Sequence, residues 1–91
     1  SIVYITDIQT VEGAYIEKKH ILGGLRQYVQ QMDRYFKEKG VADRINTVFF
    51  KTKRTKAEKQ FVKLRKRYTK DGIDLRVLPQ GEFSFQPVKK E

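Results

Sequence analysis

The chain has 91 residues, of which 38% are hydrophobic, and its 20 Lys and Arg residues outnumber 11 Asp and Glu for a formal net charge of +9. This size predicts one small α/β domain over residues 1–91, and the surplus of positive charge predicts an anionic partner. The lack of cysteine excludes disulfides, thiolate metal sites and cysteine nucleophiles, and no apolar run approaches the roughly 20 residues that span a bilayer.

The first elements predicted along the chain are a strand and a helix, separated by an irregular stretch. Residues 2–5 are β-branched or aromatic, as in a buried strand that ends near Asp7 or Ile8. Residues 9–24 are open to three interpretations, a loop, a hairpin arm or the frayed start of a helix, because glycines interrupt them. From Leu25, apolar residues recur with the period of an amphipathic helix that ends at Gly40.

A second strand and a second helix are predicted next. Residues 45–50 are nearly all apolar at their end, which indicates a strand. The segment Thr55-Lys56-Ala57-Glu58 matches a capping box, in which Thr55 accepts a bond from a backbone N–H and Glu58 reaches back. This motif predicts a helix from Thr55 to about Lys70, and Gly72 is placed to end it.

The last predicted elements are two strands. Residues 73–78 indicate a third strand, and a turn at 79–81 precedes alternating residues 83–86, which predict an antiparallel fourth strand. Residues 87–91 are expected to form a solvated tail. The order β-α-β-α-β-β predicts a mainly parallel four-stranded sheet with an antiparallel edge hairpin.

The strongest functional signal is a block of positive charge at residues 51–70. It holds ten of the 20 Lys and Arg residues, and Glu58 is its only acid. Helical periodicity puts Phe61, Leu64 and Tyr68 on one face and basic residues on the opposite face. We predict that the basic face and the preceding loop bind nucleic-acid phosphates. The residues of this predicted site are Lys51, Lys53, Arg54, Lys56, Lys59, Lys63, Lys66, Arg67 and Lys70.

The composition of the block predicts weak sequence specificity. Lys outnumbers Arg, and arginine is the residue that makes bidentate contacts to guanine. Tyr68 is a candidate to stack on a base, and core packing is its alternative role. A sheet with nearby aromatic residues slightly favours RNA or single strands over duplex DNA.

Other partners remain open. The basic face could dock on an acidic protein or a ribonucleoprotein, as in a small inhibitor or assembly factor. A membrane partner is not expected, because the apolar face of the helix is narrow and is needed for the core. Unpaired strand edges make a homodimer plausible. We expect a cytoplasmic binding protein, rather than an enzyme, that uses no cofactor or metal.

Asp7 is a weak candidate for catalysis. Ligands collect beyond the carboxyl ends of strands in α/β sheets, and a carboxylate there can hold Mg²⁺. The strand ending in Asp7, the following order of elements and the Gly-Ile-Asp-Leu-Arg-Val-Leu-Pro segment at 72–79 resemble NYN/PIN-type nuclease domains. The resemblance covers most of this chain but part of such a domain, and it implies a Mg-dependent nuclease. Such domains use several acids, and the later ones are missing or doubtful here; Asp7 could instead cap a turn or pair with a lysine.

Two further features carry alternative interpretations. His20 is the only histidine, which excludes paired-histidine chemistry within one chain. A lone general base remains open, and a surface or loop-packing role is the better interpretation. Gly23 and Gly24 precede a predicted helix, where a phosphate-binding loop could form. No complete phosphate-loop or dinucleotide-binding pattern is present, so a simple turn is the better interpretation.

Overall fold

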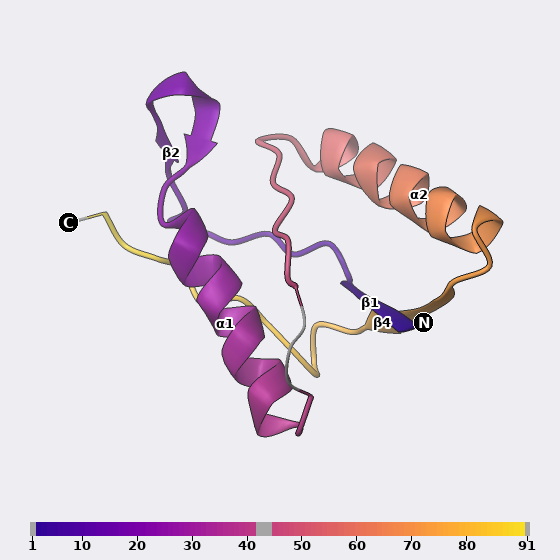
Figure 1. Cartoon of the computed structure of the whole chain (residues 1–91). Helices are drawn as coiled ribbons and strands as arrows, with labels where there is room; N and C mark the ends of the chain where they lie inside the picture. Colours follow the sequence, from indigo (N-terminus) through magenta and orange to yellow (C-terminus); the bar gives the residue numbers. More distant parts are fainter. Residues whose placement is uncertain (1, 42–44, 91) are drawn as a thin grey trace. The chain divides into compact units, whose positions relative to one another are not determined.

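The computed structural model describes residues 2–41 and 45–90, and its helices and strands are shown in Figure 1. The chain forms two units, one made of residues 1–10 and 51–84 and the other of residues 11–50 and 85–91. Residues 11–50 of the second unit are therefore inserted into the sequence of the first, between the first strand and its helix, and residues 85–91 follow the first unit. Each unit is described below by itself.

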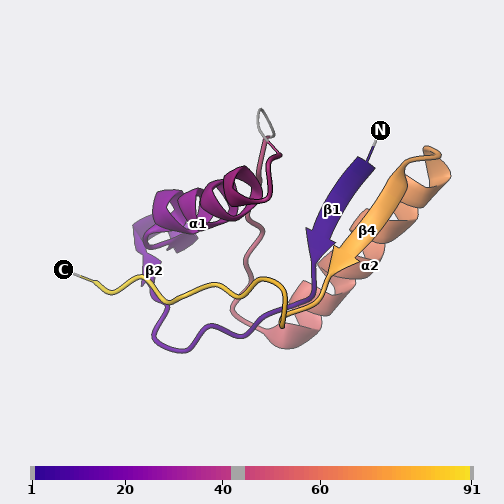
Figure 2. The ribbon, with the colours of Figure 1, turned by 90° about the horizontal axis from the view of Figure 1, so that it is seen from below.

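The first unit is a β-α-β arrangement. Strands β1 (Ile2–Thr6) and β4 (Asp74–Leu78) form a parallel pair, with Ile2 opposite Asp74 and Thr6 opposite Leu78. Helix α2 (Arg54–Lys70) precedes β4 and lies along the two strands (Figure 2). Because parallel neighbours cannot be joined by a tight turn, the helix makes the connection that their direction requires.

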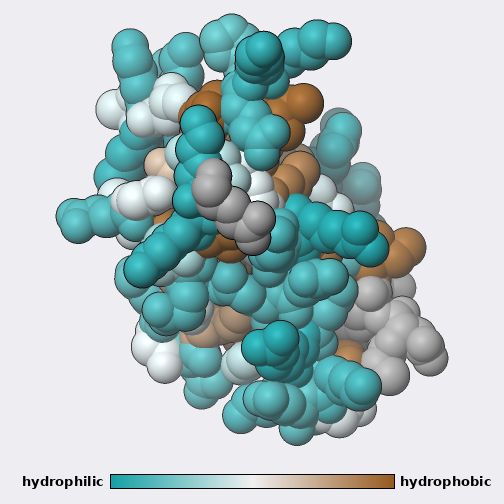
Figure 3. Space-filling view, turned by 90° about the vertical axis from the view of Figure 1, so that its left-hand side faces the viewer, coloured by the Kyte–Doolittle hydropathy of each residue, from teal (hydrophilic) through white to brown (hydrophobic). Residues whose placement is uncertain are grey.

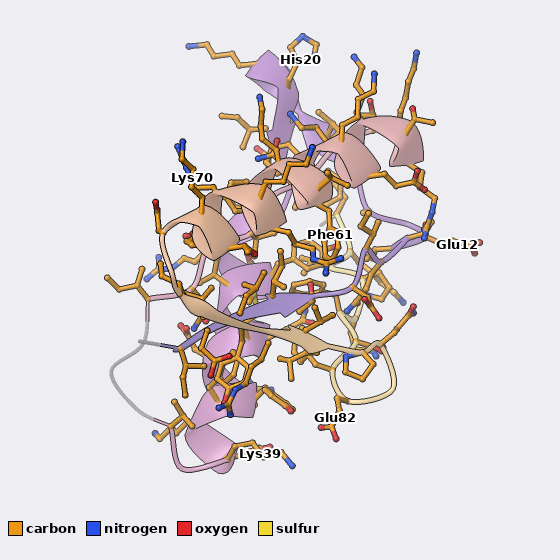
Figure 4. All side chains as sticks on the ribbon, turned by 90° about the vertical axis from the view of Figure 1, so that its right-hand side faces the viewer. Glu12, His20, Lys39, Phe61, Lys70 and Glu82 are labelled. Carbon is orange, nitrogen blue, oxygen red and sulfur yellow. The ribbon has the colours of Figure 1, made fainter. Side chains whose placement is uncertain are left out.

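Side-chain alternation gives the two faces of this ladder different characters. Val3, Ile5, Leu75 and Val77 share one face, and Asp74 and Arg76 lie on the other. On the helix, Leu64 is buried and Phe61 is half-buried. Figure 4 shows Phe61 pointing from α2 toward the strands. The apolar side of α2 therefore faces the ladder, as its periodicity predicts.

The predicted capping box is wrong. The N-cap of α2 is Lys53, in extended conformation and without a side-chain cap, and the helix begins at Arg54. The carbonyl of Lys53 accepts the first helical bonds, from the N–H groups of Lys56 and Ala57, each at 3.1 Å. Thr55 therefore already lies within the helix, where its side chain cannot cap the start of the helix.

Both helices end where glycine was predicted to end them. At the end of α2, Gly72 has φ +73°. The N–H of Gly72 bonds to the carbonyl of Thr69 at 3.1 Å, and the N–H of Ile73 bonds to that of Tyr68 at 3.0 Å. This pair of bonds is a Schellman motif, which needs a residue with positive φ and so favours glycine. Gly40 ends helix α1 (Leu25–Glu38) with the same pattern of bonds.

The second unit consists of a short hairpin, α1 and the C-terminal segment. Strands β2 (Ile16–Glu17) and β3 (Ile21–Leu22) are antiparallel, and the one-turn 3₁₀ helix η1 (Lys18–His20) joins them. Of the three interpretations of residues 9–24, the hairpin arm is correct for residues 16–22, and residues 9–15 form a loop. Helix α1 (Leu25–Glu38) buries Tyr28 and Phe36 on the predicted apolar face.

The C-terminal segment contacts α1 through residues 85–88, whereas Lys89 and Lys90, in the predicted solvated tail, are exposed. The side-chain amide of Gln31 donates to the carbonyl of Gln86 at 2.9 Å and accepts the Gln86 N–H at 2.8 Å. The N–H of Val88 donates to the Tyr28 hydroxyl at 3.0 Å, and the Phe85 ring meets that of Tyr28 edge to face. Residue 91 lies outside the described residues.

Two predicted strands are not formed. Residues 45–50 alternate in exposure like a strand but have no ladder partner, and Ile45 is 97% exposed. After β4 the chain turns, and the N–H groups of Glu82 and Phe83 both bond to the Pro79 carbonyl. Residues 83–86 follow this turn without forming a strand. The four-stranded sheet is thus replaced by a two-stranded parallel ladder and a small hairpin. The α/β class is confirmed, and the single domain stays a prediction.

Candidate nucleic-acid interface

The first unit carries most of the positive charge. Its sequence segments hold eleven Lys and Arg residues and five Asp and Glu, a net charge of +6, whereas the second unit has a net charge of +3. The two units are similar in length, so the charge is concentrated on the unit that contains α2.

A single stripe on α2 contains six of these cations, and we call it the basic stripe. Its members are Lys56, Lys59, Lys63, Lys66, Arg67 and Lys70, and all six are exposed. Because an α-helix turns by about 100° per residue, these six residues lie within an arc of about 100° on its circumference. From Lys56 to Lys70 the stripe is about 21 Å long at the rise of an α-helix. In Figure 4, Lys70 points away from the strands. The predicted assignment of the helix faces is therefore confirmed.

The stripe is not neutralised by acids of the described residues. Glu58, the only acid in the block, forms its ion pair with Arg54, at 3.4 Å. Within residues 2–41 and 45–90, no stripe residue makes an ion pair or a side-chain hydrogen bond. Lys51 and Lys53 in the preceding loop are exposed as well. Repulsion among these cations is thus relieved by solvent and salt, or by an anion from outside the chain.

Three arginines of the first unit interact with other side chains of the same unit. Arg54 donates to the Thr10 hydroxyl at 3.1 Å in addition to its pair with Glu58. The Arg65 guanidinium lies 5.6 Å from the centre of the Phe61 ring. Arg76 pairs with Asp74 at 3.1 Å. The pKa of Arg76 is raised by the hydrogen bond with Asp74 and then by Coulombic attraction to that carboxylate. The partial neutralisation of Arg54 could have been predicted, because Arg54 and Glu58 have the i,i+4 spacing of a helical ion pair.

The start of α2 adds to the positive potential. No side chain caps it, and no acidic residue occurs in its first turn. The N-terminal end of a helix carries a partial positive charge from its unpaired N–H groups. This end is flanked in sequence by Lys51, Lys53 and Lys56. The partial charge of the helix end and the charges of these side chains are therefore both positive.

Tyr68 lies apart from the stripe. It is half-buried and shares the inward side of α2 with Phe61 and Leu64. By helical periodicity, this side is roughly opposite the stripe. The predicted stacking residue is therefore not placed beside the predicted phosphate contacts, and core packing accounts for it.

Asp7 occupies the predicted position at the carboxyl end of β1. Its carboxylate is exposed, and its N–H continues the ladder by donating to the Leu78 carbonyl at 3.0 Å. In the described part of the chain, no group of three or more His, Asp or Glu side chains is arranged to hold a metal ion. Among the described residues, Asp7 therefore does not belong to a cluster of three or more potential metal ligands.

The glycine pair has a packing role that the sequence does not reveal. A Cβ atom at Gly23 would lie 2.0 Å from Cε2 of Tyr15, and one at Gly24 would lie 2.5 Å from Cγ1 of Val88. These glycines let α1, the hairpin and the C-terminal segment approach closely. His20 is exposed at the tip of the hairpin (Figure 4), in agreement with a surface role.

The surface has small apolar areas as well as charge. Figure 3 shows a face that is mostly hydrophilic, with separate hydrophobic areas among polar side chains. None of the helices in the described ranges has the length and apolar character needed to cross a bilayer.

Comparison with known proteins returns no matching family model, no matching curated protein and no matching solved structure. The resemblance to NYN/PIN-type nuclease domains therefore stays a resemblance in the order of elements.

Proposed function

We propose that the protein binds nucleic acid through its phosphate backbone, using the basic stripe of α2 and the loop at 51–53. The observation that carries this proposal is the row of six exposed cations without an acidic partner among the described residues. An extended row of cations on a rigid helix matches an extended row of phosphates. A small anion would engage two or three of these side chains and leave the rest repelling one another.

The stripe supports binding with little base preference. Five of its six members are lysines, which act as flexible point charges toward phosphate, and Arg67 is its only guanidinium. Base recognition commonly uses planar side chains that form two hydrogen bonds with a base edge. We therefore expect affinities that vary with salt much more than with sequence.

An acidic protein is the competing partner, and the experiment distinguishes it. Charge reversal at Lys59, Lys63, Arg67 and Lys70 gives the stripe variant. A matched control variant reverses three lysines and one arginine of the second unit, and all four are exposed. These control positions are Lys18, Lys19, Arg34 and Lys89. Both variants change the net charge equally, so they separate the effect of the stripe from that of total charge.

Binding of labelled DNA and RNA is measured by fluorescence anisotropy at low salt. We expect the stripe variant to lose affinity by on the order of 100-fold or more and the control variant by much less. Circular dichroism checks that both variants are folded, and replacement of the same four stripe residues by Gln provides a milder variant. Equal losses in the stripe and control variants, or no binding by the wild-type chain, would contradict the proposal. Retention of a cellular complex after nuclease treatment would favour the acidic protein.

A further inference from the structure

We propose that the basic stripe binds the backbone of a double helix in preference to a single strand. This inference rests on the proposed function and names the class of nucleic acid. The sequence slightly favours single strands because it predicts a sheet with aromatic residues near the basic block. The part of the chain that the structure describes has neither a four-stranded sheet nor an aromatic side chain on the stripe.

The first argument is the position of the aromatic rings. Proteins that bind single strands gain affinity from each base that stacks on an aromatic side chain. All 11 aromatic residues of this chain are described, and Phe49 alone is exposed, at 55%. Phe49 belongs to the second unit. On α2, Phe61 and Tyr68 are half-buried on the side away from the stripe, and Arg65 lies over the Phe61 ring. The stripe therefore offers charge without a stacking surface.

The second argument is that the stripe has one regular backbone. It lies on one helix that is anchored by buried Leu64 and ended by the bonds of Gly72 and Ile73. A duplex holds its phosphates in a fixed order, at about one charge per 1.7 Å of helix axis. A single strand has a lower charge density and loses conformational freedom when it aligns with a straight row of cations. Without stacking, little compensates for that loss.

The third argument is that the stripe is one-sided. The flank of α2 between the stripe and the Phe61 side contains Thr55, Glu58, Val62 and Thr69, and Val62 is 49% exposed. The two arginines that also lie there are engaged within the chain, Arg54 with Glu58 and Arg65 over the Phe61 ring. A helix inserted into a groove would place cations on both flanks, toward the two backbones. Cations on one flank fit a helix that lies against one row of phosphates. Such contact reads no bases, so duplexes of DNA and RNA share the required chemistry.

The test uses the full chain and four labelled ligands of about 24 nucleotides, a single strand and its duplex in both DNA and RNA. We expect each duplex to bind at least about tenfold more tightly than its own strands, which exceeds the twofold expected from its doubled phosphates. A single strand that binds as tightly as its duplex would overturn the inference.

Two substitutions give an independent readout. Tyr68→Leu and Phe49→Leu remove the rings that could stack, and we expect single-strand affinity to stay within about twofold of wild type. A loss of more than about fivefold in either folded variant would show stacking and overturn the inference. If Tyr68→Leu unfolds the chain, the ratio of duplex to single-strand affinity in the wild type still decides. If the stripe variant loses binding but the wild-type chain prefers single strands, this inference alone is refuted. If the stripe variant binds as the wild type does, the proposed function is refuted.

Discussion

Gly23 illustrates how much a single residue depends on a neighbour that the sequence does not identify. Its N–H donates to the Tyr15 carbonyl at 2.8 Å, and the space for its missing side chain is filled by the Tyr15 ring. The sequence predicts a turn at this glycine, because glycine interrupts helices and strands. It does not predict the ring, because that contact requires the pairing of β2 with β3.

The substitution Gly23→Ala tests this contact. The new Cβ would overlap the Tyr15 ring, so the ring or the hairpin must move, and we expect a loss of about 1–3 kcal/mol in the free energy of unfolding. Gly81→Ala is the matched control, since Gly81 has ordinary φ and open space around its Cβ position. We expect the control to stay within about 0.5 kcal/mol of wild type. Urea denaturation measures both, and equal stability of the two variants would mean that Gly23 does not pack as described.

Among the candidate site residues, the exposure of a side chain could be predicted more readily than its hydrogen-bond partners. The 3.6-residue period places the stripe on the outer face of α2, and all its members are exposed there. The same period puts Tyr68 beside Leu64, so its inward position follows from the pattern. The bond from Arg54 to Thr10 joins residues 44 positions apart, and local patterns carry no signal for such a contact.

At the level of elements, helices could be predicted better than strands. A helix satisfies its backbone bonds within itself, so the apolar period and a terminal glycine were enough to locate α1 and α2. A strand needs a partner from elsewhere in the chain. Residues 45–50 have strand-like composition, but β1 pairs directly with β4 and they join no ladder. Residues 85–88 instead bond to Tyr28 and Gln31 of α1.

The uncapped start of α2 leads to a prediction in which stability and binding change in opposite directions. Lys53 has the extended backbone of an N-cap, with φ −117° and ψ 132°, but its side chain makes no capping bond. Lys53→Asn supplies a cap and removes a cation. We expect stability to rise by about 0.5–2 kcal/mol and nucleic-acid affinity to fall severalfold.

Two measurements on the same preparation check the Lys53→Asn variant, thermal unfolding and anisotropy with a labelled duplex. Lys53→Ala is the control, because it removes the cation without adding a cap. A stability of Lys53→Asn no higher than that of Lys53→Ala would show that the first turn is not open to capping. Unchanged affinity in both variants would exclude Lys53 from the interface.

At the scale of the whole molecule, the distribution of charge is what the sequence predicts most fully. The block at 51–70 is visible in the sequence, and α2 presents most of its cations on one side. The division of the chain is less visible, because residues 11–50 form a separate unit whose contacts depend on the C-terminal segment. A pass along the sequence shows no boundary at residues 10, 50 or 84, since no linker-like composition marks them.

The central claim is that the basic stripe of α2 neutralises phosphates, and the salt dependence of binding tests it most directly. Each phosphate contact contributes about −0.7 to −0.9 to the slope of log affinity against log salt, so five or six contacts predict a slope of about −4 to −5. We expect this slope for the wild-type chain and for the control variant, and a slope nearer −1 to −2 for the stripe variant. Equal slopes for the stripe and control variants would contradict the account.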